Sequence, residues 1–233
     1  MAGGNSLEGR EQKKGIAVNT LYTMGGLLFM NAVLQIVITP LLNRMMGAEQ
    51  LGGLLYITGL VAIICPSIGQ ALNNSRLVVR RDFDVTNGDY DWLLLGFGLI
   101  GSIVALFMSG KSLESPLMAA GVFLMFMLTV FRYYGDVEYR LNLNYRRYFI
   151  YYFLIGIGYL AGFGIYRLTG QWVWIYLIGE AAALAFVGVT GNIFHQKRIF
   201  YDGTWSRLFS YVIVSYYQYD NEYGSPCDQT DPR

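Results

Sequence analysis

The sequence predicts an all-α protein, a polytopic membrane helix bundle with six transmembrane helices. Three observations support this: 54% of the 233 residues are hydrophobic, only 14% are charged, and the charged residues leave long gaps. An ordinary soluble domain has about 25% charged residues, so a soluble globular enzyme is disfavoured. The same composition rules out a basic nucleic-acid-binding domain, so no nucleic-acid partner is expected.

The gaps between charged residues define six apolar segments. A helix that crosses a bilayer needs about 20 predominantly apolar residues, and each gap has roughly that length. Residues 1–15 are predicted to form a polar cytoplasmic leader, and residues 16–198 a single six-helix transmembrane bundle. The predicted spans are 18–42, 51–71, 92–108, 116–133, 148–166 and 172–194.

The basic residues fall mainly on one side of the predicted membrane. If the N-terminus is inside, 14 of the 17 Lys and Arg residues lie in cytoplasmic segments. The other three, Arg44, Lys111 and Arg167, then lie in outside loops. Positive charges accumulate in the short cytoplasmic loops of membrane proteins, so both termini are predicted to be cytoplasmic.

The side chains that enzymatic chemistry requires are scarce. Cys65, Cys227 and the single histidine His195 provide neither a metal site nor a histidine-based catalytic set. Residues 105–112 end in Gly-Lys-Ser, but they finish a predicted membrane helix, whereas a phosphate-binding loop follows a strand. We therefore expect no enzymatic activity and no cofactor. A membrane glycan enzyme is a weaker alternative, because the acidic clusters that it would need are missing.

Polar residues recur at four-residue steps in the first predicted span. Asn31, Gln35 and Thr39 fall on one face of a helix. Amide groups are costly against lipid, so this face is predicted to meet other helices or a hydrophilic cavity. The sequence leaves both interpretations open, namely interhelical hydrogen bonding and a passage for a polar cargo.

Glu180 is the only acidic residue inside a predicted span. A carboxylate at membrane depth is expensive and indicates a functional site. It could couple transport to protons or cations, pair with an arginine of a cavity, or contact the cargo. The alternative is a neutral Glu that is hydrogen-bonded between helices. The only Arg or Lys within the predicted span bounds is Arg132, at the cytoplasmic end of the fourth, so the partner of Glu180 would come from a helix end or from water.

The predicted cytoplasmic connection at residues 132–148 combines arginine with tyrosine. Its arginines are candidates for contacts with anionic headgroups or a pyrophosphate, although the orientation rule alone also explains them. These candidates are Arg132, Arg140, Arg146 and Arg147.

The fifth predicted span carries two repeating patterns. Gly158 and Gly162 have the four-residue spacing of small residues that lets membrane helices approach closely. Tyr152, Tyr159 and Tyr166 recur every seven residues on another face. Both patterns are predicted to serve helix packing.

Several short motifs together resemble a known family. The chain resembles the start of polysaccharide biosynthesis membrane proteins, which are lipid-linked oligosaccharide flippases for O-antigen or capsule repeat units. These belong to the multidrug/oligosaccharidyl-lipid/polysaccharide exporter superfamily. The resemblance covers about residues 15–198. It rests on Asn19-Thr-Leu-Tyr22, on Pro40-Leu-Leu-Asn-Arg44, on Gly47-Ala-Glu-Gln-Leu-Gly52 and on Arg76 after the second span.

The resemblance implies two six-helix bundles around a central cavity, of which this chain has the N-terminal one. It implies that a polyprenyl-pyrophosphate-linked oligosaccharide is flipped across the bacterial inner membrane by alternating access. The expected partners are the lipid bilayer, this cargo, and either a second copy or a separate second half. The candidate cavity residues are Arg44, Arg76, Glu180 and the polar stripe Asn31, Gln35 and Thr39.

The end of the chain departs from this pattern. Residues 208–219 are apolar for only about 12 residues, which is too short for a span, and the chain then becomes polar. We interpret residues 199–233 as a truncated or frame-shifted tail, or residues 208–219 as a short interfacial segment. Two alternatives remain for the whole chain, a drug or cation antiporter of the same superfamily and a non-transporting fragment.

Overall fold

The computed structural model describes residues 4–82, 87–110, 113 and 115–190. Within these residues the secondary structure is entirely helical, so the predicted all-α class is confirmed. The predicted tail, residues 199–233, and the last four residues of the sixth predicted span lie outside the described residues.

Six helical segments are long and apolar enough to cross a membrane, as predicted. The first consists of three helices in line, α1 (Gly4–Ala32), the π-helix η1 (Val33–Ile38) and α2 (Thr39–Met45). The chain is therefore a multi-pass membrane protein. The other five spans belong to α3 (Ala48–Asp82), α4 (Asn87–Ser109), α5 (Pro116–Leu141), α6 (Tyr145–Thr169) and α7 (Val173–Thr190).

The prediction of a long connection at residues 132–148 is wrong. Helix α5 continues to Leu141, and only residues 142–144 separate it from α6. Similarly, Arg76 does not begin a loop, because α3 runs on to Asp82. The physical reason is that the first charged residue of each extension, Arg132 or Arg76, has an ionic partner inside the bundle and need not reach water.

The π-helix η1 interrupts the first span just before Pro40. The Thr39 backbone N–H bonds to Leu34 O five residues back, and the Thr39 hydroxyl donates to the same oxygen at 2.8 Å. Proline has no N–H to donate, and its ring crowds the carbonyl four residues earlier. We attribute the wider turn to this crowding. Single π-turns inside α-helices occur frequently at functional sites.

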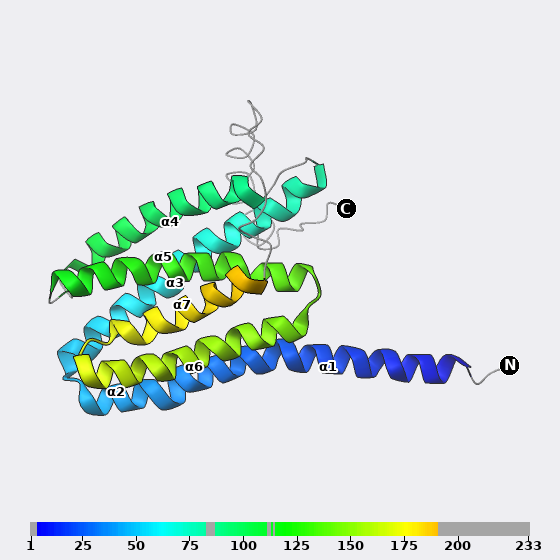
Figure 1. The fold of residues 1–233 in the computed structure, drawn as a ribbon, viewed down its shortest axis with the longest axis horizontal. Helices are drawn as coiled ribbons and strands as arrows, with labels where there is room; N and C mark the ends of the chain where they lie inside the picture. The colour runs from blue at the N-terminus through cyan, green and yellow to red at the C-terminus, as the bar shows by residue number, and fades with distance from the viewer. Residues whose placement is uncertain (1–3, 83–86, 111–112, 114, 191–233) are drawn as a thin grey trace, which may run out of the picture.

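The helices pack in a chain of neighbours (Figure 1). Helix α1 lies along α6, α6 along α7, and α7 along α5, while α3 and α4 pack against α5 and against each other. The most extensive interface joins α6 and α7. The N-terminal part of α1, which includes most of the predicted leader, continues as a helix past the other helices.

The α6–α7 interface depends on glycines at the predicted four-residue spacing. A Cβ atom on Gly158 would lie 2.7 Å from Gly179 Cα, and one on Gly162 would lie 2.5 Å from Trp174 O. These are backbone atoms and cannot rotate away. The prediction of close packing at Gly158 and Gly162 is therefore confirmed.

We expect Gly162→Ala to lower the thermal stability of the protein, because the added methyl forces the two helix backbones apart. Such overpacking costs about 1–3 kcal/mol. Gly164→Ala in the same helix is the matched control, since nothing lies within 4 Å of a Cβ there. Thermal unfolding in detergent, followed by size-exclusion chromatography, measures the difference. Equal midpoints for the two variants would contradict the observed packing.

Candidate functional site

A buried ion pair joins α5 and α7 inside the bundle. Arg132 Nη1 lies 3.2 Å from Glu180 Oε1. Arg132 is 8% exposed and Glu180 only 2%, so neither charge reaches the surface of the bundle. Glu180 is close to the middle of its span, which falls between residues 181 and 182 of Val173–Thr190. The partner expected from a helix end or from water is therefore an arginine that lies within a span.

Tyr159 of α6 connects the two charges. Its hydroxyl donates to Glu180 Oε1 at 3.1 Å and accepts from Arg132 Nη1 at 3.3 Å. The same Arg132 nitrogen lies 3.7 Å from Met30 Sδ of α1, and its guanidinium carbon lies 4.8 Å from the Tyr133 ring centroid. The network thus brings four helices, α1, α5, α6 and α7, to one guanidinium group.

Some buried polar atoms of the ionic network have no hydrogen-bond partner among the described residues. Arg132 Nε and Glu180 Oε2 are buried and have no hydrogen-bond partner among the described residues. The Thr129 hydroxyl, on the preceding turn of α5, donates to Met125 O at 2.8 Å. A buried polar atom without a partner costs about 1–3 kcal/mol. Such an arrangement is not one that stability alone would favour, which makes the network a candidate functional site.

A second acid lies one helical turn from Arg132. Asp136 Oδ2 accepts from the Tyr152 hydroxyl at 2.8 Å, and both residues are at least nine-tenths buried. The Tyr151 hydroxyl donates to the Arg132 backbone oxygen at 3.1 Å. Three tyrosines of α6 therefore donate hydrogen bonds to polar groups of α5 and α7, namely Tyr151, Tyr152 and Tyr159.

A separate ion pair joins α3 and α5. Arg76 Nη2 lies 3.4 Å from Glu138 Oε2, and the Arg76 guanidinium lies 5.0 Å from the Tyr134 ring centroid. Arg76 is 1% exposed, and its Nε and Nη1 atoms have no hydrogen-bond partner among the described residues. Nearby, Asn73 Nδ2 donates to Tyr133 O at 2.8 Å. This pair fixes the interface between the second and fourth spans.

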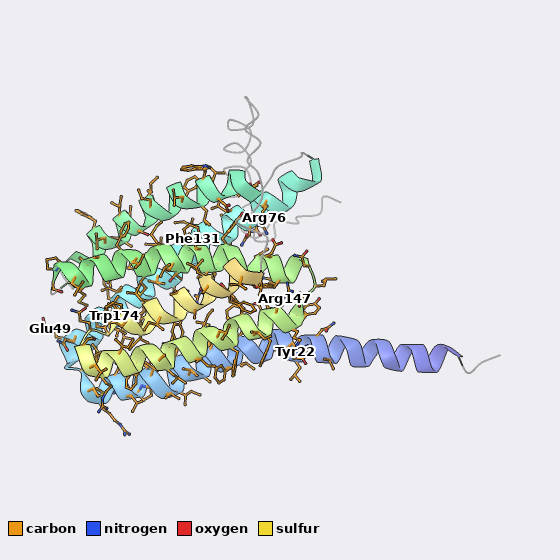
Figure 2. The ribbon with its side chains drawn as sticks, in the orientation of Figure 1. Tyr22, Glu49, Arg76, Phe131, Arg147 and Trp174 are labelled. Atoms are coloured by element: carbon orange, nitrogen blue, oxygen red, sulfur yellow. The ribbon has the colours of Figure 1, made fainter. Side chains whose placement is uncertain are left out.

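The structure brings together only two of the candidate residues, Arg132 and Glu180. Arg132 is buried and faces Glu180, so the expectation that it contacts headgroups at the surface does not fit its position. The other three arginines of that group are exposed, and Arg147 Nη1 donates to Thr190 O at 3.1 Å. Arg76, labelled in Figure 2, is buried between helices. Arg44 is exposed on α2.

The polar stripe of the first span lies on a different surface. Asn31 and Gln35 are exposed, whereas Thr39 is half-buried. The Asn31 amide donates to Leu27 O at 2.9 Å. The π-turn between residues 31 and 39 changes their angular spacing, which explains why the three residues do not share one exposed face.

The acceptors of the tyrosine hydroxyls and the partner of Arg76 are not predicted by the sequence. Tyr152 and Tyr159, which the pattern predicts to serve packing, both also donate to buried carboxylates. The seven-residue spacing is the available signal, because it places hydroxyl groups in register on one helix face. Asp136 and Glu138 have no such signal, since the sequence places them in a connection outside the membrane.

Comparisons with known proteins do not assign the chain to a family. No protein-family model, no curated protein and no solved structure matches it. No group of three or more His, Cys, Asp or Glu side chains that could hold a metal ion occurs among the described residues. The resemblance to oligosaccharide flippases therefore remains a prediction, and the argument for function rests on the geometry.

We expect Arg132→Met and Glu180→Gln each to lower the unfolding midpoint by about 10 °C, because each leaves one buried charged or polar group without its partner. Breaking a buried pair costs about 3–5 kcal/mol, and about 2–4 °C corresponds to 1 kcal/mol in a chain of this size. The double variant should recover part of the loss in a double-mutant cycle. The matched control is Glu49→Gln at an exposed position. Additive losses would argue against direct coupling of Arg132 and Glu180.

Proposed function

We propose that the chain is one bundle of a membrane exporter that flips lipid-linked oligosaccharide repeat units across the bacterial inner membrane. In this proposal the cargo is a polyprenyl-pyrophosphate-linked oligosaccharide. Its polar head moves along the surface of α1 and η1 that carries Asn31 and Gln35, while the lipid tail stays in the bilayer. The chain acts without enzymatic chemistry and without a cofactor, and both termini are cytoplasmic.

The observation that carries the proposal is the exposure of two amide side chains at membrane depth. Asn31 is at the middle of the 28-residue span Val18–Met45, and Gln35 follows one turn later. Burying an amide in hydrocarbon without a hydrogen bond costs roughly 2–7 kcal/mol. A surface that faced only lipid would not favour such residues. A polar cargo passing along this surface, or a partner that encloses a wet cavity there, supplies the missing hydrogen bonds.

Such a cavity needs a second wall. Helices α1 and η1 pack against α6 and leave a broad lateral surface, on which Leu21, Leu28 and Ile36 are 62–73% exposed. A second copy of this bundle would cover this surface in the proposed exporter. The amides would then line the cavity, and the apolar side chains would pack at its edges.

The exposed arginines support an anionic cargo head. Arg140, Arg146 and Arg147 lie around the short connection between α5 and α6, on the side where the basic residues concentrate. Guanidinium groups bind phosphate oxygens in a bidentate manner. In the proposal they attract the pyrophosphate at the cytoplasmic entrance.

The position of Glu180 does not favour the antiporter alternative. An antiporter would need the Glu180 carboxylate to be available to a proton or a cationic cargo. Glu180 is instead paired with Arg132 and Tyr159 in the core of the bundle. We therefore assign the network a positioning role, in which it fixes α1, α5, α6 and α7 around a common centre.

The proposal predicts flipping by the full chain reconstituted in liposomes. The cargo is a fluorescent polyprenyl-pyrophosphate disaccharide in both leaflets, and the measurement is the fraction that becomes accessible to a membrane-impermeant quencher over time. The double variant Asn31→Leu/Gln35→Leu should slow flipping about tenfold, as expected when two hydrogen bonds of about 0.7 kcal/mol each are lost.

The matched control is Gln70→Leu, an exposed position on α3. It should flip the cargo at the wild-type rate. The proposed function is rejected if wild-type protein flips the cargo no faster than empty liposomes do. If the Asn31→Leu/Gln35→Leu variant flips the cargo as fast as wild type does, this surface is not part of the transport path.

A further inference from the structure

The first span carries a regular row of exposed side chains on its outward face. The row begins on α1, reaches the first half of η1, and recurs at alternating steps of three and four residues. We call this row the α1 seam, and its members are Leu21, Met24, Leu28, Asn31 and Gln35. The three apolar side chains are 55–73% exposed, and both amides are exposed. From residue 21 to residue 35 the seam extends about 21 Å along the helix axis.

The α1 seam lies opposite the face of α1 that packs on α6. Helix α1 lies at the edge of the bundle, beside α6 (Figure 1). A Cβ atom on Gly26 would lie 2.9 Å from Phe149 O of α6, and Met30 is buried. Leu28 is two residues from each of them, and successive residues of a helix are about 100° apart, so Leu28 points to the other side. The contacts with α6 therefore leave the seam uncovered.

The spacing of the seam is that of a coiled coil. Alternating steps of three and four give a mean period of 3.5 residues, at which the side chains of two helices interlock as knobs into holes. Membrane helices commonly pack in this left-handed way, with crossing angles of about 20°. The seam can therefore pack against a second helix that has the same period.

The two amides indicate that more than lipid covers the seam. Lipid chains can cover its three apolar residues, but they offer no hydrogen bond to an amide. The Asn31 amide donates one N–H to Leu27 O at 2.9 Å, which leaves its other N–H and its oxygen. Gln35 adds a second exposed amide one turn later. An amide both donates and accepts, so it is complementary to another amide.

We propose that the chain forms a parallel homodimer through the α1 seam. All copies of one chain insert in the same orientation, so the two-fold axis lies along the membrane normal and each seam residue meets its own counterpart. Leu21, Met24 and Leu28 pack against the same residues of the second copy. The amides of Asn31 and Gln35 bond across the axis, and polar residues within an apolar seam fix the register of the two helices.

The inference rests on the proposed function in placing a second copy on this surface, and it adds how the two copies contact each other. When no cargo is present, the amides bond to each other. A passing polar head takes over these hydrogen bonds, while the apolar part of the seam keeps the copies together. The seam ends at η1, because the π-turn changes the angular spacing of the residues that follow.

Disulfide cross-linking of the full chain in liposomes, at a low ratio of protein to lipid, tests the geometry. Cys65→Ala and Cys227→Ser are introduced first, so that each variant has a single cysteine. Leu28→Cys should form a linked dimer about tenfold faster than Ile63→Cys does, because the dimer holds the two thiols at a high effective concentration. Ile63 on α3 is the matched control, since it is 68% exposed and lies near the middle of its span.

The strength of association tests the role of the amides. Energy transfer between two labelled populations of the full chain, followed as lipid is added, measures the dissociation constant of the dimer. Asn31→Leu/Gln35→Leu should raise this constant about tenfold, because interhelical hydrogen bonds are lost within the bilayer. Gln70→Leu removes an exposed amide from α3 and should leave the constant unchanged. Unfolding midpoints check that both variants are folded.

Three results would each overturn the proposal. One is the absence of energy transfer that depends on dilution with wild-type protein. Another is equal cross-linking rates for Leu28→Cys and Ile63→Cys. The third is an unchanged dissociation constant in the folded Asn31→Leu/Gln35→Leu variant. Dimer formation is measured without cargo, so a dimer that flips no cargo would reject the proposed function alone. Flipping by a chain that forms no seam dimer would reject this inference alone.

Discussion

The ion pair between Arg132 and Glu180 constrains the whole bundle. At membrane depth no water solvates two opposite charges, so they must remain together and their helices must remain in place. Because Tyr159 joins both charges and Met30 contacts the guanidinium, α1, α5, α6 and α7 are fixed around one point. A buried pair of this kind adds little net stability compared with an apolar core, but separating its members is strongly unfavourable. Its effect is therefore to select one arrangement of the helices over alternatives.

The glycines of α6 and α7 make this arrangement geometrically possible. Gly158 lies against Gly179, so the two helix backbones approach without intervening side chains, and the Tyr159 ring packs directly over Gly179. Tyr159 follows Gly158, and Glu180 follows Gly179, so this close backbone approach is next to the hydrogen bond between hydroxyl and carboxylate. A larger residue at either glycine would move the hydroxyl away from the acid. Small-residue packing and the ionic network are thus two parts of one interface, which explains why α6 and α7 share the most extensive contact.

The helical class, the six spans and the glycine contacts could be predicted because each depends on local composition or spacing. Gaps between charges mark helices of membrane length, and four-residue glycine steps mark close approach. The ends of α3 and α5 could not be predicted in this way. A charged residue is normally expected to end a helix at the membrane surface, yet α5 continues past Arg132 and α3 past Arg76, whose charges are paired with Glu180 and Glu138. These partners are 48 and 62 residues away in the sequence, and no local pattern identifies them. The inward position of Thr39 was missed for a related reason, since the π-turn alters the angle that a regular helix would give.

The polar groups in the interior of the bundle differ from those on its surfaces in whether a ligand can reach them. Inside, the buried acids are engaged, Glu180 by Arg132 and Tyr159 and Asp136 by Tyr152. A cargo could reach these groups only by breaking contacts that hold the helices together. The polar groups that can meet a ligand without such a cost are at the surface, as the amides of Asn31 on α1 and Gln35 on η1. In the proposed exporter, which must release its cargo, accessible uncharged groups suit that task better than a buried ion pair. The interior charges therefore hold the helices in position, and in that proposal recognition belongs to the surfaces.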